Sequence, residues 1–213
     1  TDGFFRQEDR GDVGKLKSEN AALRVELVKM KALEKDNAAL RDQFKQSYPK
    51  AETLLPADVV GMPGFLPGVS AVEEIVIDKG SRDGVRVGRV VVLKNVLVGR
   101  VERTSAHLSV VEVVSHEGIS FTAETSKTSA LGVLTGVGGG EMVLEKVLLS
   151  DKLQAGDTVI SKGDIAANGE GFLPGLVVGR IVSVNKKASS LFQSAEVESL
   201  VDVEGLKMVF VQN

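Results

Sequence analysis

The most constraining feature of this sequence is an apolar helical seam in residues 12–47, because everything after residue 56 has the pattern of short strands. The seam residues recur at spacings of three and four, so they lie in a narrow stripe on one helix face. They are Val13, Leu16, Asn20, Leu23, Leu27, Met30, Leu33, Asn37, Leu40 and Phe44. The stripe has no partner within its own segment. We therefore predict that residues 1–48 form a coiled-coil helix that dimerises through the seam, with residues 1–11 disordered.

An internal repeat sharpens this prediction. The pentapeptide Asn-Ala-Ala-Leu-Arg occurs at Asn20–Arg24 and again at Asn37–Arg41, 17 residues apart. This interval equals two heptads plus three residues, and the three additional residues locally overwind a supercoil. Both Asn residues fall at an a-type position, where a buried Asn costs stability but favours a two-stranded pair in register. The alternative is a helix packed on its own β-region, with the Asn residues at the rim.

Composition excludes several classes of function. The 213-residue chain has a net charge of −3 and no basic stripe with interleaved aromatic residues, which argues against a nucleic-acid partner. It has no cysteine, so disulfide frameworks and thiolate chemistry are excluded. The sequence contains no apolar run of about 18 residues, the length expected of a membrane-spanning helix. The core is predicted to be aliphatic, since Trp is absent.

The region after the helix is predicted to be mainly β. Its strand patterns are short, evenly spaced and separated by Gly turns, which is typical of barrels or sandwiches. We predict a linker at 49–56, a first β-barrel domain at 57–115, a second at 116–199 and a C-terminal strand at 200–213. The sequence leaves open whether that last strand returns to the first barrel. The predicted strands are 72–77, 85–93, 96–103, 108–114, 119–125, 129–136, 141–149, 157–161, 176–184, 193–199 and 207–212.

A short duplication supports two related β-units. Val98–Val101 has the pattern Val-Gly-Arg-Val, and Val178–Ile181 repeats it as Val-Gly-Arg-Ile. Upstream, Val87–Val90 corresponds more loosely to Ala155–Thr158. The two offsets are 80 and 68 residues, so the second copy would carry about twelve extra residues, which we place in the loop 164–175.

Four glycines are predicted to shape turns and bulges. Gly80 and Gly84 are expected to supply positive φ angles, with Asp83 capping the turn between them. Gly99 and Gly179 interrupt strand patterns, where Gly usually marks a bulge or a tight barrel corner.

The sequence offers little catalytic chemistry. His107 and His116 are the only histidines, and neither has a second His at zinc-protease spacing. Paired small barrels invite a serine-protease interpretation, but Ser161 has no preceding Gly to shape a nucleophile loop. The Gly-rich segment 136–140 lacks the Lys-Ser/Thr of a phosphate loop, and 78–84 does not match a calcium loop. We predict a protein that is not an enzyme and has no catalytic, cofactor-binding or metal residues.

One loop is a possible partner-binding element. Phe172 and Leu173 lie in a segment punctuated by Gly and Pro, and exposed apolar residues on such loops often contact partners. The alternative is that both side chains pack across a barrel mouth.

Several motifs stand in series after the predicted helix: Ile77–Gly88, Leu97–Val101, Ala130–Gly136, Gly156–Ser161 and Phe172–Gly175 leading to Val178–Ile181. Together with the helix, this series resembles the MreC family of cell shape-determining proteins. The resemblance implies a coiled-coil helix followed by two small β-barrels, related in shape to trypsin-like barrels but without catalytic residues. It also implies an N-terminal transmembrane helix, absent from this chain, that anchors the protein at the periplasmic or extracellular face of the cytoplasmic membrane.

The same resemblance implies a function in bacterial cell elongation. Members of this family are scaffolds that self-associate as dimers or filaments. They bind a class B penicillin-binding transpeptidase and membrane components of the elongation complex. A periplasmic adaptor of a transport system, of the membrane-fusion type, is the alternative. Adaptors of that type use a helical hairpin, whereas this sequence shows one long helical segment.

Overall fold

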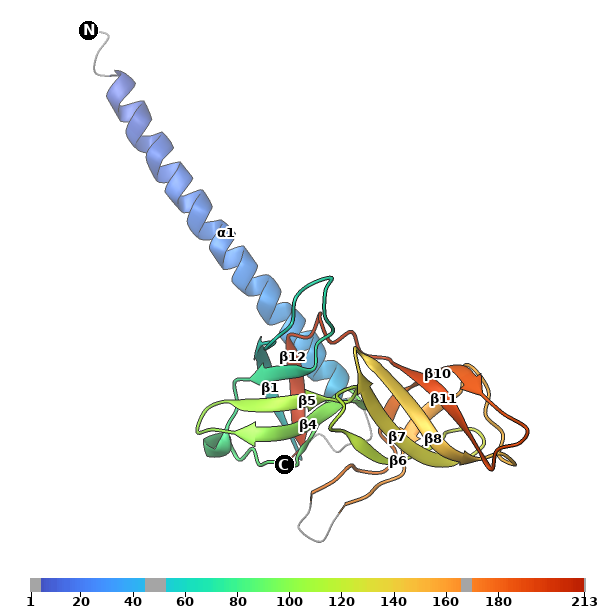
Figure 1. Ribbon diagram of the computed structural model, residues 1–213. Coiled ribbons are helices and arrows are strands. Elements are labelled where there is room, and N and C mark those ends of the chain that lie inside the picture. Colours follow the sequence, from blue (N-terminus) through green and yellow to red (C-terminus); the bar gives the residue numbers. More distant parts are fainter. Residues whose placement is uncertain (1–4, 45–52, 166–169, 213) are drawn as a thin grey trace. The chain divides into compact units, whose positions relative to one another are not determined.

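The computed structural model describes residues 5–44, 53–165 and 170–212 (Figure 1). The chain divides into a helical unit, Thr1–Asp42, and a β-unit, Gln43–Asn213. Helix α1 spans Phe5–Phe44 and so includes residues 5–11, part of the segment for which the sequence predicts disorder. Arg6, Gln7, Glu8 and Arg10 favour a helix in its first turns, and a helical Gly such as Gly11 costs only about 1 kcal/mol relative to Ala. None of the helices described is long and apolar enough to cross a membrane.

Six strands of the β-unit close a barrel, here called the first barrel (Figure 1). They are β1 (Leu54–Gly61), β2 (Glu74–Ile77), β3 (Val90–Leu93), β4 (Val96–Thr104), β5 (Ser109–Val113) and β12 (Met208–Gln212). β1 pairs with β2 and β12, β5 pairs with β2 and β4, and β3 pairs with β4 and β12. All of these pairings are antiparallel. The predicted mainly-β fold with a small barrel is confirmed, and the C-terminal strand lies between β1 and β3.

The first strand differs from the prediction, because β1 includes the end of the predicted linker at 49–56. Pro56 lies within β1 opposite Phe210 of β12. On its other side β1 meets β2 only from Val59 onward, so the missing N–H of Pro56 faces no strand there. Proline is tolerated in a strand where its missing N–H would face no neighbouring strand, and this explains how a Pro-containing segment forms β1.

The other six strands are β6 (Ser120–Thr125), β7 (Leu131–Gly138), β8 (Glu141–Leu148), β9 (Thr158–Ser161), β10 (Val177–Asn185) and β11 (Phe192–Ser199), here called the β6–β11 sheet. They pair in the order β11-β8-β7-β6-β9-β10, and β11 also pairs with β10. Each of these strands therefore has two neighbours among the six. A single parallel bridge, Val177 with Val96, joins this sheet to the first barrel.

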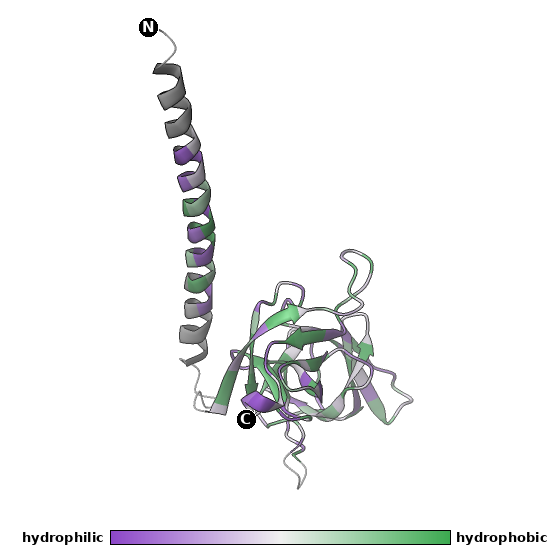
Figure 2. Cartoon of the chain, turned by 90° about the vertical axis from the view of Figure 1, so that its left-hand side faces the viewer, coloured by the Kyte–Doolittle hydropathy of each residue, from purple (hydrophilic) through white to green (hydrophobic). Residues whose placement is uncertain are grey.

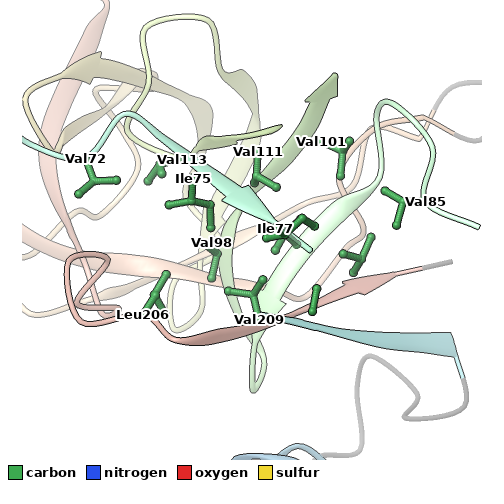
Figure 3. Close-up of a cluster of buried hydrophobic side chains, with 13 residues drawn as sticks. Val72, Ile75, Ile77, Val85, Val98, Val101, Val111, Val113, Leu206 and Val209 are labelled. Atoms are coloured by element: carbon green, nitrogen blue, oxygen red, sulfur yellow. The ribbon is translucent and has the colours of Figure 1, made fainter. Parts of the chain in front are cut away.

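The first barrel encloses an aliphatic core (Figure 3). Alternate residues of its strands point inward: Ile75 and Ile77 are fully buried, whereas Val76 between them is only partly buried. Full burial of one such side chain contributes about 1.5–3 kcal/mol. The buried members of the cluster are Ala57, Val72, Ile75, Ile77, Val85, Val91, Val98, Val101, Val111, Val113, Leu206, Val209 and Val211.

Gly99 and Gly179 occupy equivalent places in two strand pairs. A side-chain carbon on Gly99 would overlap the backbone carbonyl of Glu112, and one on Gly179 would overlap the backbone carbonyl of Glu198. In both pairs the register shifts just beyond the residue two positions after the glycine, which is Val101 in β4 and Ile181 in β10. Both glycines therefore permit close approach of a neighbouring strand, next to a bulge.

The turns before these strands match as well. Gly88 and Gly156 have φ angles of 83° and 87°. The N–H of Gly88 donates to the carbonyl of Val101, and the N–H of Gly156 donates to that of Ile181, both at 2.8 Å. The copies differ in the link between the next two strands, which is residues 94–95 in one and 162–176 in the other. These shared contacts support the predicted duplication.

Gly80 and Gly84 have different roles. Gly84 has a φ of 94° and ends a short 3-10 helix, Ser81–Asp83, as predicted. Gly80 has a φ of −131°, so the predicted positive angle is wrong. A side-chain carbon there would lie 2.5 Å from the backbone nitrogen of His107, so Gly80 is required for close packing instead. The N–H of Gly80 donates to the Asp83 carboxylate at 2.9 Å.

Candidate interaction surface

Helix α1 has several large apolar side chains that are exposed. Figure 2 shows hydrophobic and hydrophilic residues interspersed along this helix. The seam residues Leu23, Leu27, Met30 and Leu33 are between 53% and 67% exposed, and Asn20 is also exposed. The helix alone therefore leaves the central part of the predicted stripe uncovered. The remaining predicted positions lie on the α1 backbone, but their side chains are outside the described residues; they are Val13, Leu16, Asn37, Leu40 and Phe44.

The predicted partner loop turns inward. Phe172 is 1% exposed and stacks on Phe121 of β6, with 4.1 Å between ring centroids. The guanidinium carbon of Arg100 lies 5.8 Å from the centroid of the Phe172 ring. Leu173 is partly buried, and its carbonyl accepts a 2.5 Å hydrogen bond from Ser161. The structure thus favours internal packing for Phe172, and partner contact through its side chain is excluded in this conformation.

Ser161 and the two histidines have structural partners. The Ser161 hydroxyl is buried and also accepts a hydrogen bond from the N–H of Leu176 at 3.0 Å. His107 lies beside Arg82, with 3.4 Å between the ring Nε2 and a guanidinium nitrogen. The Nδ1 atom of His116 accepts from the N–H of Gly118 at 3.0 Å. Within the described residues, no group of three or more His, Cys, Asp or Glu side chains is placed to hold a metal ion.

The loop between β1 and β2 is a second exposed apolar element, which the sequence reasoning missed. Phe65 packs against the core of the first barrel, whereas Leu66 and Val69 are exposed. The Ser70 hydroxyl accepts from the N–H of Leu66 at 3.0 Å and donates to the carbonyl of Gly64 at 3.3 Å. The loop is thus held in one shape while it presents two aliphatic side chains. Its Pro-Gly punctuation signals a loop but does not show which residues face outward.

Comparison with known sequences gives consistent matches. The family described as "Rod shape-determining protein MreC, barrel core" matches residues 68–213. The cell shape-determining protein MreC of Haemophilus influenzae is 24% identical over 212 residues, or 96% of this chain and 58% of that protein. MreC of Caulobacter vibrioides is 31% identical over 169 residues, or 77% of this chain and 47% of that protein. The chain spans about half the length of these curated relatives.

Solved structures share the fold. One structure of MreC superposes with a TM-score of 0.73 at 21% identity, over 85% of this chain and 99% of that chain. The major periplasmic domain from the cell shape-determining filament MreC gives 0.58 at 15% identity, over 74% and 93%. A chain in the complex between penicillin-binding protein PBP2 and MreC from Helicobacter pylori gives 0.55 at 14% identity, over 75% and 97%.

Proposed function

Because this chain belongs to the MreC family of rod shape-determining proteins, we propose that it is an extracytoplasmic scaffold of the bacterial cell-elongation machinery. It self-associates through α1, holds a wall-synthesis enzyme with its β-unit and catalyses no reaction. A transmembrane helix outside this chain anchors it at the periplasmic or extracellular face of the cytoplasmic membrane. The likeness to a periplasmic domain of MreC supports this location.

The observation that carries the proposal is the exposed apolar stripe of α1. Leu23, Leu27, Met30 and Leu33 are each more than half exposed in the single chain. Full burial of such a side chain is worth about 1.5–3 kcal/mol. When two helices both contribute, this gain offsets an association cost of about 4–15 kcal/mol. Pairing with a second copy covers the stripe that α1 leaves open.

The charges beside the stripe favour a parallel pair in register. With Asn20 at an a position, acidic residues occupy g positions, and basic residues occupy the e positions five residues later. In a parallel pair the g position of one helix meets that e position of the other, whereas antiparallel pairing would bring like charges together. The four pairs are Asp12 with Lys17, Glu19 with Arg24, Glu26 with Lys31, and Asp36 with Arg41.

We further propose that the β6–β11 sheet works as a second small barrel. Two observations support this: each of its six strands has two neighbours among the six, and β9–β11 repeat the ladder of β3–β5. Two such modules give a scaffold a rigid surface with separate faces for separate contacts.

For the partner, we propose a class B penicillin-binding transpeptidase. The fold is shared with a chain of the complex between PBP2 and MreC from Helicobacter pylori, which supports this class of enzyme. Exposed Leu66 and Val69 on the ordered β1–β2 loop supply apolar surface of the kind that partners cover. Pull-down of the transpeptidase by the full chain tests this point, and failure to retain it under any salt condition contradicts it.

Self-association is tested by replacing Leu23 and Leu33 with Asp. Two charges in the stripe should convert dimers to monomers, measured by sedimentation equilibrium. Val25→Asp with Val28→Asp is the matched control, because both residues are exposed on the same helix outside the seam. The control should remain dimeric. A dimeric seam variant, or equal behaviour of the two variants, would show that α1 does not pair through this stripe.

A further inference from the structure

Three turns at one end of the β6–β11 sheet form a connected surface, here called the turn platform: residues 126–130, 149–157 and 186–191. The Thr128 hydroxyl donates to the carbonyl of Lys152 at 2.8 Å. The N–H of Leu149 donates to the carbonyl of Leu191 at 3.0 Å. The buried side chain of Gln193 donates to the carbonyl of Leu148, the last residue of β8, and to that of Asp151 in the β8–β9 connection. These bonds hold the three turns together.

The turn platform carries exposed apolar side chains. Leu191 is 80% exposed at the end of the β10–β11 turn, directly before β11. Next to it, Phe192 and Leu148 face each other across the β8–β11 ladder, and each is about half exposed. Leu131, at the start of β7, is exposed at the same end of the sheet. Three leucines and a phenylalanine therefore gather at a projecting edge, where they contribute nothing to the described core.

Lysines surround these apolar residues. Five lysines at this end of the sheet are exposed, whereas Glu145 is the exposed carboxylate there, Asp151 is partly buried and Asp157 is buried. The lysines are Lys127, Lys146, Lys152, Lys186 and Lys187. The chain as a whole has a net negative charge, so this cluster concentrates positive charge at one end of the β6–β11 sheet.

The other end of the same ladder holds an acidic groove of about 460 Å³. Its walls include apolar Val143 and Val182, and its carboxylates are Glu141, Glu196 and Glu198. Glu141 and Glu198 lie directly opposite each other in the β8–β11 register, an arrangement of like charges that costs stability. Glu196 accepts from the Ser183 hydroxyl at 2.7 Å, and Arg180 lies 3.9 Å from Glu198. The described residues that line the groove include no cation.

We propose that the turn platform of one copy docks into the acidic groove of a second copy. This inference extends the self-association in the proposed function. Lys186 and Lys187 meet the groove carboxylates, and Leu191 and Phe192 cover the valine walls. The platform and the groove lie at opposite ends of β8 and β11, about 20 Å apart at roughly 3.3 Å per residue.

This contact differs in symmetry from helix pairing. A parallel helix pair is isologous and closes as a dimer, whereas a platform in a groove joins two different surfaces. A head-to-tail contact along the strand direction leaves a free platform and a free groove at its ends. It therefore continues to further copies, and the two contacts together link dimers into larger assemblies.

The test uses the full chain and two charge reversals, measured by sedimentation velocity over a range of concentrations. The parent protein should form species larger than dimers, and high salt should dissociate them. Lys186→Glu with Lys187→Glu, and separately Glu196→Lys with Glu198→Lys, should each weaken this step at least about tenfold. An equimolar mixture of the two variants should restore it, because each platform then meets a groove of opposite charge.

Controls separate this contact from helix pairing and from misfolding. Arg86→Glu with Lys207→Glu makes the same charge change on exposed residues of the β-unit and should assemble like the parent. The milder Lys186→Gln with Lys187→Gln should weaken assembly in the same direction. The helix variant of Leu23 and Leu33 should lose dimers but keep single copies that join head to tail. A parent that stops at dimers, single variants that assemble normally, or a mixture that fails to recover would overturn the proposal.

Discussion

Two segments of the β-unit, β3–β5 and β9–β11, share a ladder and differ most in the connection between their first two strands. In each, a Gly without room for a side chain sets the register beside a bulge. The link between the first two strands is 94–95 in one copy and 162–176 in the other. The longer link places Phe172 against Phe121 and within reach of Arg100 on β4. The ladder thus fixes the strand positions, and the inserted loop fixes how the second copy packs against the first.

Each of the two segments also has an Arg–Glu pair at the equivalent position, and the two pairs differ in burial. Arg100 and Glu112 face each other with 3.4 Å between charged atoms, and the Glu112 side chain is 11% exposed. Arg180 and Glu198 hold the equivalent register at 3.9 Å, but the Glu198 side chain is 65% exposed. One repeated pair is therefore part of the packed interior, whereas the other borders the acidic groove and remains available to a partner.

The largest expected effect comes from removing the aromatic ring that only the longer copy has. Phe172→Ala should lower the free energy of unfolding by about 3–5 kcal/mol, because it leaves a cavity beside Phe121. Chemical denaturation measures the loss. Phe192→Ala removes the same side chain from an exposed position and should change stability by less than about 0.5 kcal/mol. Equal losses in the two variants would show that the loop does not anchor the second copy.

The next effect tests whether the ladders are equivalent. Gly99→Ala and Gly179→Ala should each destabilise the protein by about 2–4 kcal/mol, since the added carbon meets a backbone carbonyl in both. Thermal unfolding followed by circular dichroism compares them. Gly61→Ala is the control, because its added carbon would make only an ordinary 3.7 Å contact with Val76. If only one of the two strand variants is destabilised, the glycine is required for close strand packing in only one of the copies.

The smallest effect distinguishes the two ion pairs. Glu112→Gln should cost about 1–3 kcal/mol, because a mostly buried carboxylate beside Arg100 is lost. Glu198→Gln should change stability by no more than about 0.5 kcal/mol, because solvent screens the exposed pair. Urea denaturation of both variants under the same buffer gives the difference. Similar values would mean that burial does not separate the repeated pairs.

Local patterns in the sequence predict most of the strands. Eleven predicted strands overlap β2–β12, because each carries its own short apolar run or alternation of apolar residues. β1 escapes prediction because Pro56 argues against a strand, and only its neighbours β12 and β2 show that the missing donor faces no ladder. The angle of Gly80 likewise depends on the loop at His107, which lies far away in the sequence.

The candidate interaction surfaces also differ in whether a local sequence pattern can predict them. The spacing of apolar residues in α1 is enough to predict its stripe. The exposure of the side chains at the centre of the stripe follows from the helix alone. Phe172 resembles an exposed loop residue in sequence because the side chain that buries it, Phe121, belongs to another strand. The turn platform and the acidic groove each collect residues from separate elements, so no local pattern could reveal either one.

The closure of the first barrel by β12 has a consequence for how the protein is made. Gln212 pairs with Leu54, so the first strand of the β-unit is synthesised long before the strand with which it pairs. β6–β11 are contiguous in sequence and can assemble while a gap remains between β1 and β3. A nascent chain interrupted before β12, Met208–Gln212, would carry the complete strands β6–β11 beside a first barrel that is still open between β1 and β3. Quality control acting on exposed strand edges would thereby remove incomplete copies before they join an assembly.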